Sequence, residues 1–351
     1  MKIIKKTFSL EYADAPEGAL FLDIETTGLK PETSHLYLFG CIWQDAPGYW
    51  KFRQWFAESP FEERAVLREV NDFAKDFRTF VHFNGDRFDL PYLNVKAADF
   101  GLDSIFTRRE SLDLYPILKP LKTFLRLPNC RQKSFESFLD TGRKDIYNGG
   151  ELIDFYHRYV KTGSEALLQP LLLHNEEDVL GTVSLLSLFP YVRLINGDAE
   201  FSDVSLLSDD EDVLLSLRTK DRYPISVSTL SDGIFLRVDH DRVLLKLPVR
   251  EQTLKFFYPD PKNYFYLISE DQAVHKSVAA FVNPENRVKA TKENCYIKKT
   301  ARFYPLMQTE GTEVFRECCR GEAYGIWDPA LADNVSGWAA YVGAFLRSLK
   351  A

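Results

Sequence analysis

The chain has 351 residues, of which 45% are hydrophobic and 27% charged, and its net charge is -7. This length and composition predict a globular protein of about two domains. The negative net charge excludes a protein coated in positive charge for tight, indiscriminate nucleic-acid binding, but it leaves nucleic acid open as a substrate. The five cysteines have no C-x-x-C spacing, so we expect reduced thiols. We identify no signal peptide and no apolar run close to a membrane span, and therefore expect a cytoplasmic protein without membrane contact.

The first predicted core strand, residues 21–26, carries two carboxylates, Asp23 and Glu25. Alternate side chains of a strand point to the same face, so the two acids project together while Leu22 and Ile24 point to the core. Like charges this close repel each other unless a cation lies between them, and a divalent metal is the usual solution. An isolated D-x-E also fits a half-exposed strand whose acids face water.

Two β-rich runs, residues 35–43 and 49–56, follow and are joined by a turn with Pro47 and Gly48. With the first strand they form a three-stranded meander. A helix is then predicted from Ser59, because proline and two glutamates precede an apolar stripe at helical spacing.

A second acidic segment, residues 82–93, is predicted to contain the end of a strand, a glycine turn and the start of a helix, and it supplies Asp89. A further strand is expected at residues 111–115. There, Asp113 is interpreted either as an acid close to the site or as a cap at the strand end.

The third segment, residues 171–180, has a helical pattern with His174 and Asp178 four residues apart. This separation leaves the two side chains only about 40° apart around a helix, so they share one face. Histidine and carboxylate on one face are suited to metal binding or proton transfer.

These three segments resemble the three exonuclease motifs of the DEDD (DnaQ-like) 3'-5' exonucleases of the ribonuclease H-like superfamily. The positions of Asp23, Glu25, Asp89 and Asp178 match the four carboxylates of that family. The resemblance covers about the first 190 residues and implies an α/β fold, a ribonuclease H-like mixed sheet flanked by helices. The segment 144–150 (KDIYNGG) before a Tyr-rich helix resembles the YprB-like bacterial branch.

The resemblance also implies a cofactor and a reaction. Two divalent ions, Mg²⁺ or Mn²⁺, would support hydrolysis of phosphodiester bonds at the 3' end of DNA or RNA. In this interpretation Asp23 bridges both ions, Glu25 and Asp178 complete the first, and Asp89 helps to hold the second, partly through water.

Substrate contacts are implied by the same resemblance. Thr26, Thr27 and Leu29 would lie beside the terminal nucleotide, and Asn84 and Phe88 of the second segment would also contact the substrate.

His174 departs from the family pattern. The third motif has either tyrosine with three residues before the acid or histidine with four, and here histidine stands at the tyrosine spacing. We interpret His174 as a residue that orients or deprotonates the attacking water. The alternative is a helix-surface histidine without a role.

Residues 198–212 contain seven acids and no Lys or Arg, which predicts a linker. It would separate an exonuclease domain, residues 1–197, from a smaller β-rich domain, residues 213–351. The expected strands of the second domain are residues 224–228, 234–238, 243–247 and 264–268, with Asp239, His240 and Asp241 as a turn. A packing helix is expected at residues 337–349.

Two basic stretches could contact phosphates, although a basic run is also typical of a solvated face. The first comprises Lys119, Lys122, Arg126, Arg131, Lys133, Arg143 and Lys144. The second lies in the β-rich domain and interleaves aromatic residues, which a core also needs; it comprises Arg287, Lys289, Lys292, Tyr296, Lys298, Lys299, Arg302, Phe303 and Tyr304.

Three alternatives remain open. The segment 88–93 also resembles the proofreading domain of family B DNA polymerases, but nothing after Phe201 resembles a polymerase. An endonuclease of the same superfamily would use similar metals. A catalytically inactive nucleic-acid-binding or scaffold module is expected to have lost one or more acids, and all four are present.

Overall fold

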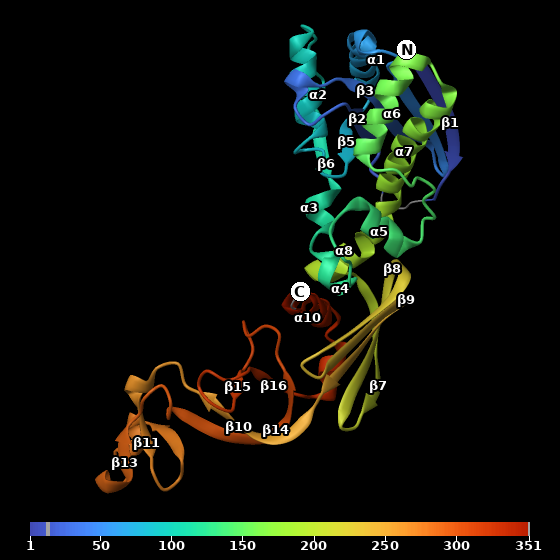
Figure 1. Cartoon of the computed structure of the whole chain (residues 1–351). Coiled ribbons are helices and arrows are strands. Elements are labelled where there is room, and N and C mark those ends of the chain that lie inside the picture. Colours follow the sequence, from blue (N-terminus) through green and yellow to red (C-terminus); the bar gives the residue numbers. More distant parts are fainter. Residues whose placement is uncertain (12–14, 350–351) are drawn as a thin grey trace. The chain divides into compact units, whose positions relative to one another are not determined.

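The computed structural model describes residues 1–11 and 15–349, which fall into two compact units, Met1–Val192 and Arg193–Ala351 (Figure 1). Unit 1 contains both helices and strands, and unit 2 is mostly β-structure. The expected α/β fold with a β-rich second part is therefore confirmed.

Unit 1 is built on a mixed six-stranded sheet. Strands β2, β3 and β4 form the predicted antiparallel meander in its middle. The pairs β2–β5 and β5–β6 are parallel. Across the sheet the order is β1 (Lys2–Ser9), β4 (Tyr49–Phe56), β3 (Leu36–Ala46), β2 (Ala19–Thr26), β5 (Thr79–His82) and β6 (Glu110–Asp113).

Helices cover both faces of this sheet. On one face, α1 (Glu63–Ala74) and α2 (Asp89–Asp99) pack on the buried residues of β2, including Leu22 and Ile24. On the other face, α6 (Gly149–Thr162) and α7 (Glu165–Ser184) pack on Tyr37, Leu38 and Phe56. The remaining helices near unit 1 are α3 (Leu114–Leu118), α4 (Leu121–Phe124), α5 (Gln132–Leu139) and α8 (Phe189–Asn196), which ends in unit 2.

One helical stretch among the described residues, Glu165–Asn196, is long and apolar enough to cross a membrane by length and composition. The expectation that no apolar run reaches such a length was therefore wrong. Within the structure, 67% of the most apolar window is buried, as in the core helix of a folded domain.

Unit 2 contains three sheets and a terminal helix. The helix, α10 (Val335–Ser348), confirms the expected packing role, since Trp338, Val342 and Phe345 are buried. The first sheet comprises β7 (Phe201–Asp209), β8 (Asp212–Ser231) and β9 (Ile234–Pro248). The second is a closed barrel of β10 (Arg250–Phe257), β14 (Tyr296–Pro305), β16 (Tyr324–Ile326) and β15 (Phe315–Arg316). The third is a small sheet of β12 (Gln272–His275), β11 (Tyr264–Leu267) and β13 (Arg287–Lys289), and α9 (Lys276–Ala279) follows β12.

The acidic stretch 198–212 is not an irregular linker. It contains β7, which pairs antiparallel with β8 along most of its length. Its acids point away from the buried side or bind cations: Asp209 pairs with Arg302, and Asp212 with Lys246 and Arg250. Charge composition alone therefore did not reveal that backbone pairing makes this stretch a strand.

The expected turn at residues 239–241 is instead an irregularity within the continuous strand β9. His240 has a positive φ of 49°, and the partner strand β8 shifts register on either side of Tyr223. A bulge of this kind tolerates polar residues in mid-strand, so the two expected strands at 234–238 and 243–247 are one.

Candidate active site

Strand β2 presents Asp23 and Glu25 on the sheet face that α7 covers. The alternation of the strand places Leu22 and Ile24 in the opposite core, as predicted. The pairing of β2 with β3 shifts register directly after Glu25, which ends the regular strand beside the two acids.

Asp23 is held in place by α7. The side-chain amide of Asn175 donates to Oδ2 of Asp23 (2.9 Å) and to its carbonyl oxygen (3.1 Å). In turn, Nε2 of Gln54 on β4 donates to Oδ1 of Asn175 (2.9 Å). Because Asn175 and Gln54 are fully buried, the orientation of Asp23 is fixed by a desolvated polar network.

Asp89 is the first residue of α2 and is buried. Its Oδ1 accepts a hydrogen bond from the backbone N–H of Ile24 (3.2 Å), which joins α2 to β2 next to Asp23. Burial raises the pKa of Asp89 to about 7, although the N–H groups of Ile24 and of Asp89 itself favour the ionised form.

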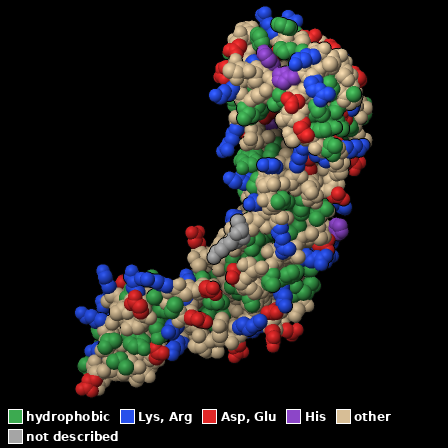
Figure 2. Space-filling view, in the orientation of Figure 1, with side chains coloured by type: hydrophobic (Ala, Val, Ile, Leu, Met, Phe, Trp, Pro, Cys, Tyr) green, Lys and Arg blue, Asp and Glu red, His purple; other side chains and the backbone are tan. Residues whose placement is uncertain are grey.

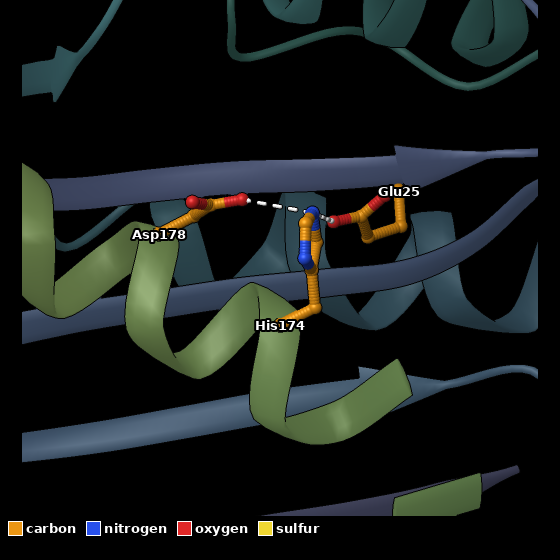
Figure 3. Close-up of side chains that lie close together, drawn as sticks. All are labelled: Glu25, His174 and Asp178. Atoms are coloured by element: carbon orange, nitrogen blue, oxygen red, sulfur yellow. Dashed lines mark ion pairs between the residues drawn. The ribbon is translucent and has the colours of Figure 1, made fainter. Parts of the chain in front are cut away.

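His174 and Asp178 lie four residues apart on α7 and point together toward Glu25 (Figure 3). Nε2 of His174 lies 3.2 Å from Oδ2 of Asp178 and 3.5 Å from Oε1 of Glu25. One ligand atom from each of the three residues lies within 4.8 Å of the others, so the group could hold a metal ion. The expectation that His174 and Asp178 share a helix face is confirmed.

The four acids act on one another electrostatically. Burial raises the pKa of Asp23 well above its usual range, and the charges of Asp178, Asp89 and Glu25 raise it further. Burial, with the charges of Asp178 and Asp89, does the same for the pKa of Glu25. Buried carboxylates that repel one another either take up protons or bind a multivalent cation.

Comparison with known proteins agrees with this geometry. A family model described as RNase_H superfamily matches residues 20–189. That range contains the strand of Asp23 and Glu25 and the helix of Asp178. Residues 20–189 form a ribonuclease H-like domain.

Solved structures are similar to this chain at low identity. The family B DNA polymerase from the archaeon Pyrobaculum calidifontis has 19% identity and a TM-score of 0.39, over 50% of this chain and 25% of that chain. Exonuclease I of E. coli, in complex with a 5cy-dA13 oligonucleotide, has 12% identity and a TM-score of 0.33, over 57% of this chain and 54% of that chain. The chain thus spans at most about half the length of these proteins. No curated protein matches the chain in sequence.

Three further polar side chains bind the candidate site residues, and of these only Arg143 had an expected role, as part of the basic stretch that could contact phosphates. Asn175 binds Asp23, Asp145 binds His174, and Arg143 binds Asp178. The buried position of Asn175 could have been recognised from the sequence. It follows Leu168 and Leu171 at helical spacing on the buried side of the helix, and it is polar. Arg143 and Asp145 lie in a loop distant in sequence, and no periodicity indicates where a loop side chain points.

The residues expected to contact substrate lie around the loop after β2 and at the start of α2. The hydroxyl of Thr26 donates to the carbonyl of Gly28 (2.9 Å), and that of Thr27 accepts from the N–H of His35 (2.8 Å), so both stabilise the loop. Leu29 is 83% exposed, which leaves its side chain free for a ligand. Asn84 has a positive φ of 65°, and the ring of Phe88 lies 5.6 Å from that of Tyr92.

Asp113 is a cap, as one of the two interpretations held. Its Oδ1 accepts from the backbone N–H groups of Asn84 (2.7 Å) and Tyr115 (2.9 Å), which fixes the turn before α2 and begins α3.

A second group that could hold a metal comprises His82, Asp86 and Asp113. However, both ring nitrogens of His82 are engaged: Nδ1 accepts from the N–H of Gly85 (3.0 Å), so Nε2 carries the hydrogen and lies 2.8 Å from the hydroxyl of Ser111. Burial lowers the pKa of His82, which favours this neutral form. The ring therefore has no lone pair left for an ion.

The basic and aromatic stretch of unit 2 is not a stacking surface. Tyr296 and Phe303 are buried, and Tyr304 packs among aromatic rings. Lys298 pairs with Asp271 and Arg302 with Asp209. On the face that Figure 2 draws, acidic and basic side chains are interspersed.

Proposed function

We propose that this protein is a metal-dependent 3'-5' exonuclease that hydrolyses phosphodiester bonds of DNA or RNA. The observation that carries the proposal is the meeting of four carboxylates from three elements, Asp23 and Glu25 on β2, Asp89 on α2 and Asp178 on α7, within a ribonuclease H-like domain. The 3' direction rests on the resemblance of these three segments to the DEDD motifs.

The residues present fit a divalent metal. Mg²⁺ and Mn²⁺ prefer carboxylate oxygens, and the raised pKa values of Asp23 and Glu25 reflect repulsion and desolvation that a cation would relieve. Asp23, Glu25, Asp89 and Asp178 would hold two such ions. When bound, the ions activate water and neutralise charge on the phosphate.

The chain's own residues supply orientation. In this proposal Nε2 of His174, which lies between Glu25 and Asp178, binds the attacking water and accepts its proton. The exposed side chain of Leu29 packs against the terminal nucleotide, next to Thr26 and Thr27. Asn84 and Phe88 contact the substrate from the start of α2.

We also propose that unit 2 contacts the nucleic-acid backbone. Lys255 of β10 is the cross-strand partner of both Lys298 on β14 and Arg316 on β15, so three cations stand in one row of the sheet. Adjacent like charges are destabilising on their own; Asp271 pairs with Lys298 and offsets part of this repulsion, and a phosphate would offset more of it. Lys299 pairs with Leu254, which belongs to the opposite, core face.

Degradation of end-labelled DNA and RNA oligonucleotides with Mg²⁺ or Mn²⁺ tests the proposal. We expect 5'-labelled strands to shorten stepwise from the 3' end, and a chelator to abolish the reaction. A circular substrate should remain intact. Internal cuts in the circle would indicate an endonuclease, and the absence of cleavage with either metal would indicate an inactive binding module.

A further inference from the structure

One loop contacts both functional residues of α7. Arg143 and Asp145 stand two residues apart, between α5 and α6. Their partners on α7, Asp178 and His174, stand four residues apart. The two loop side chains also bind each other, with Nη2 of Arg143 3.3 Å from Oδ2 of Asp145.

Asp145 determines which nitrogen of His174 carries hydrogen. Its Oδ2 lies 2.7 Å from Nδ1 of His174, and its side chain is only 1% exposed. The same carboxylate accepts a hydrogen bond from the N–H of Tyr147 (3.0 Å) and lies between two cations, Lys133 (3.1 Å) and Arg143 (3.3 Å), which favour its ionised form. An ionised carboxylate can only accept hydrogen bonds, so Nδ1 of His174 must be the donor.

The opposite nitrogen of His174 would otherwise prefer to be protonated. Nε2 faces Oε1 of Glu25 and Oδ2 of Asp178, two acceptors that favour an N–H. A neutral imidazole has only one N–H, so Asp145 competes with Glu25 and Asp178 for it. With the hydrogen on Nδ1, the lone pair of Nε2 points into the acid cluster.

Arg143 binds the remaining oxygen of Asp178. Its Nη1 lies 2.6 Å from Oδ1 of Asp178 and 3.1 Å from Oε2 of Glu136, and its Nε lies 3.7 Å from Glu177. Arg143 is largely buried, and its planar guanidinium holds each carboxylate in a defined direction. Asp178 therefore presents Oδ2 alone toward His174 and Glu25.

Two side chains of helix α5 fix the position of Arg143 and Asp178. Nε2 of Gln132 donates to Oε1 of Glu136 (2.8 Å) and to the carbonyl oxygen of Asp178 (2.7 Å). Glu136 approaches α7 so closely that a Cβ atom on Gly181 would lie 1.9 Å from its Oε1. The partner of Arg143 is thus fixed by packing.

We propose that Arg143 and Asp145 are positioning residues of the active site. Asp145 holds His174 as the Nδ1–H tautomer, and Arg143 holds Asp178 with one oxygen turned toward Glu25. The assignment rests on the proposed nuclease function for its catalytic consequence, but the side-chain states can be measured without activity.

The tautomer test uses the full chain labelled with ¹⁵N-histidine. The sequence has six histidines, and a His174→Ala spectrum identifies the signal of His174. In metal-free protein at a pH where the ring is neutral, we expect Nδ1–H in the wild type and Nε2–H in Asp145→Asn, because the amide can donate to Nδ1. Asp140→Asn is the matched control, since Asp140 is exposed and its left-handed backbone suits asparagine. An unchanged tautomer in Asp145→Asn would overturn the role of Asp145.

A kinetic test of Asp145 measures whether its contact with His174 affects kcat or KM. Asp145→Asn should lower kcat on the order of 10²-fold or more at nearly constant KM, as expected for a histidine in the wrong tautomer. Asp145→Glu keeps the acceptor and should recover part of that loss. Equal kcat values for Asp145→Asn and Asp140→Asn would contradict the proposal.

For Arg143, metal affinity is the decisive second measurement. Arg143→Lys and Arg143→Met should both lower kcat at least about tenfold, because neither side chain can bind Asp178, Glu136 and Asp145 at the same time as the guanidinium does. Arg143→Met should bind Mn²⁺ at least as tightly as the wild type in calorimetry, since a repelling cation is removed. Lys161→Gln, which removes one exposed positive charge at the end of α6, is the charge-matched control. Weaker Mn²⁺ binding by Arg143→Met, or wild-type kcat in Arg143→Lys, would overturn the role of Arg143.

Wild-type protein without nuclease activity would refute the proposed function, whereas the tautomer of His174 and the Mn²⁺ affinity would still decide the positioning roles.

Discussion

Gly40 on β3 and Asn175 on α7 are in such close contact that a Cβ atom on Gly40 would lie 1.9 Å from Oδ1 of Asn175. Asn175 is fully buried and donates to Asp23. The absence of a side chain at position 40 therefore lets α7 approach the sheet closely enough for Asn175 to hold the carboxylate of Asp23.

Gly40→Ala should consequently disturb the site through Asn175. We expect a destabilisation of about 1–3 kcal/mol, because the new methyl group overpacks a buried contact. Cleavage should fall as well, because Asp23 loses its hydrogen-bond partner. Urea denaturation and the oligonucleotide assay measure the two effects. Gly149→Ala is the control, since nothing lies within 4 Å of its Cβ position. The same stability and rate for both variants would refute the coupling.

The metal-free protein should lose stability as the pH rises from about 5 to 8. The pKa of Asp89 is about 7 in the folded protein and about 3.9 in an unfolded chain, so the folded state binds more protons in this window. Stability then falls with rising pH through the folded pKa. Asp23 and Glu25, whose pKa values are also raised, act in the same direction.

Asp89→Asn isolates this effect, because asparagine keeps an acceptor for the N–H of Ile24 but carries no charge. With a chelator present, the variant should be more stable than the wild type by about 4 kcal/mol at pH 8 but by only about 1–2 kcal/mol at pH 5. Urea denaturation at the two pH values measures this difference. A difference that does not change with pH would show that Asp89 is not a buried charge in the folded protein.

The local pattern predicted the unit 1 fold well. The D-x-E strand, the meander after it and the helix with His174 and Asp178 all form where periodicity and turn residues placed them. These features succeed because alternation and helical spacing are local. Arg143 and Asp145 were not assigned to the site because their roles depend on how a loop folds back onto α7, which no local pattern encodes.

Unit 2 was harder to predict for a related reason. The acids of residues 198–212 indicated a linker, but strand pairing with β8 and ion pairs with Arg302 and Lys246 override composition. The aromatics near Lys298 indicated a stacking surface, but strand alternation and the barrel core bury Tyr296 and Phe303.

The role of His174 can be divided into orientation and proton transfer. His174→Ala should lower turnover by about 10²–10⁴-fold. His174→Tyr introduces a phenol with a pKa of about 10, which can hydrogen-bond water but cannot accept a proton at neutral pH. If turnover of the tyrosine variant is as low as that of alanine, His174 is the base. If it approaches the wild type, His174 only orients water. An alanine variant with full turnover would exclude both roles.

The cation row on unit 2 predicts a salt-dependent contribution to substrate binding. Lys255→Gln should weaken binding and reduce the slope of log affinity against log salt by about 0.7–0.9 units, as expected for one lost phosphate contact. Lys299→Gln is the control, because Lys299 is paired with Leu254 on the core face and its Nζ lies 5.9 Å from the ring centre of Phe315. Titration of a labelled single strand at several salt concentrations measures both. Equal salt slopes for the two variants would show that Lys255, Lys298 and Arg316 do not contact the substrate.

The central claim is that Asp23, Glu25, Asp89 and Asp178 form a metal-dependent nuclease centre, and it is tested most directly by the cleavage rate of Asp23→Asn. This change removes a metal-binding charge but keeps the size of the side chain, and the network of Asn175 and Gln54 remains buried behind it. With a 5'-labelled single strand, a free 3' end and saturating Mg²⁺, we predict stepwise shortening by the wild type. The variant, with its unfolding transition preserved, should be slower by several orders of magnitude, on the order of 10³-fold or more. A wild-type rate in Asp23→Asn would contradict the account.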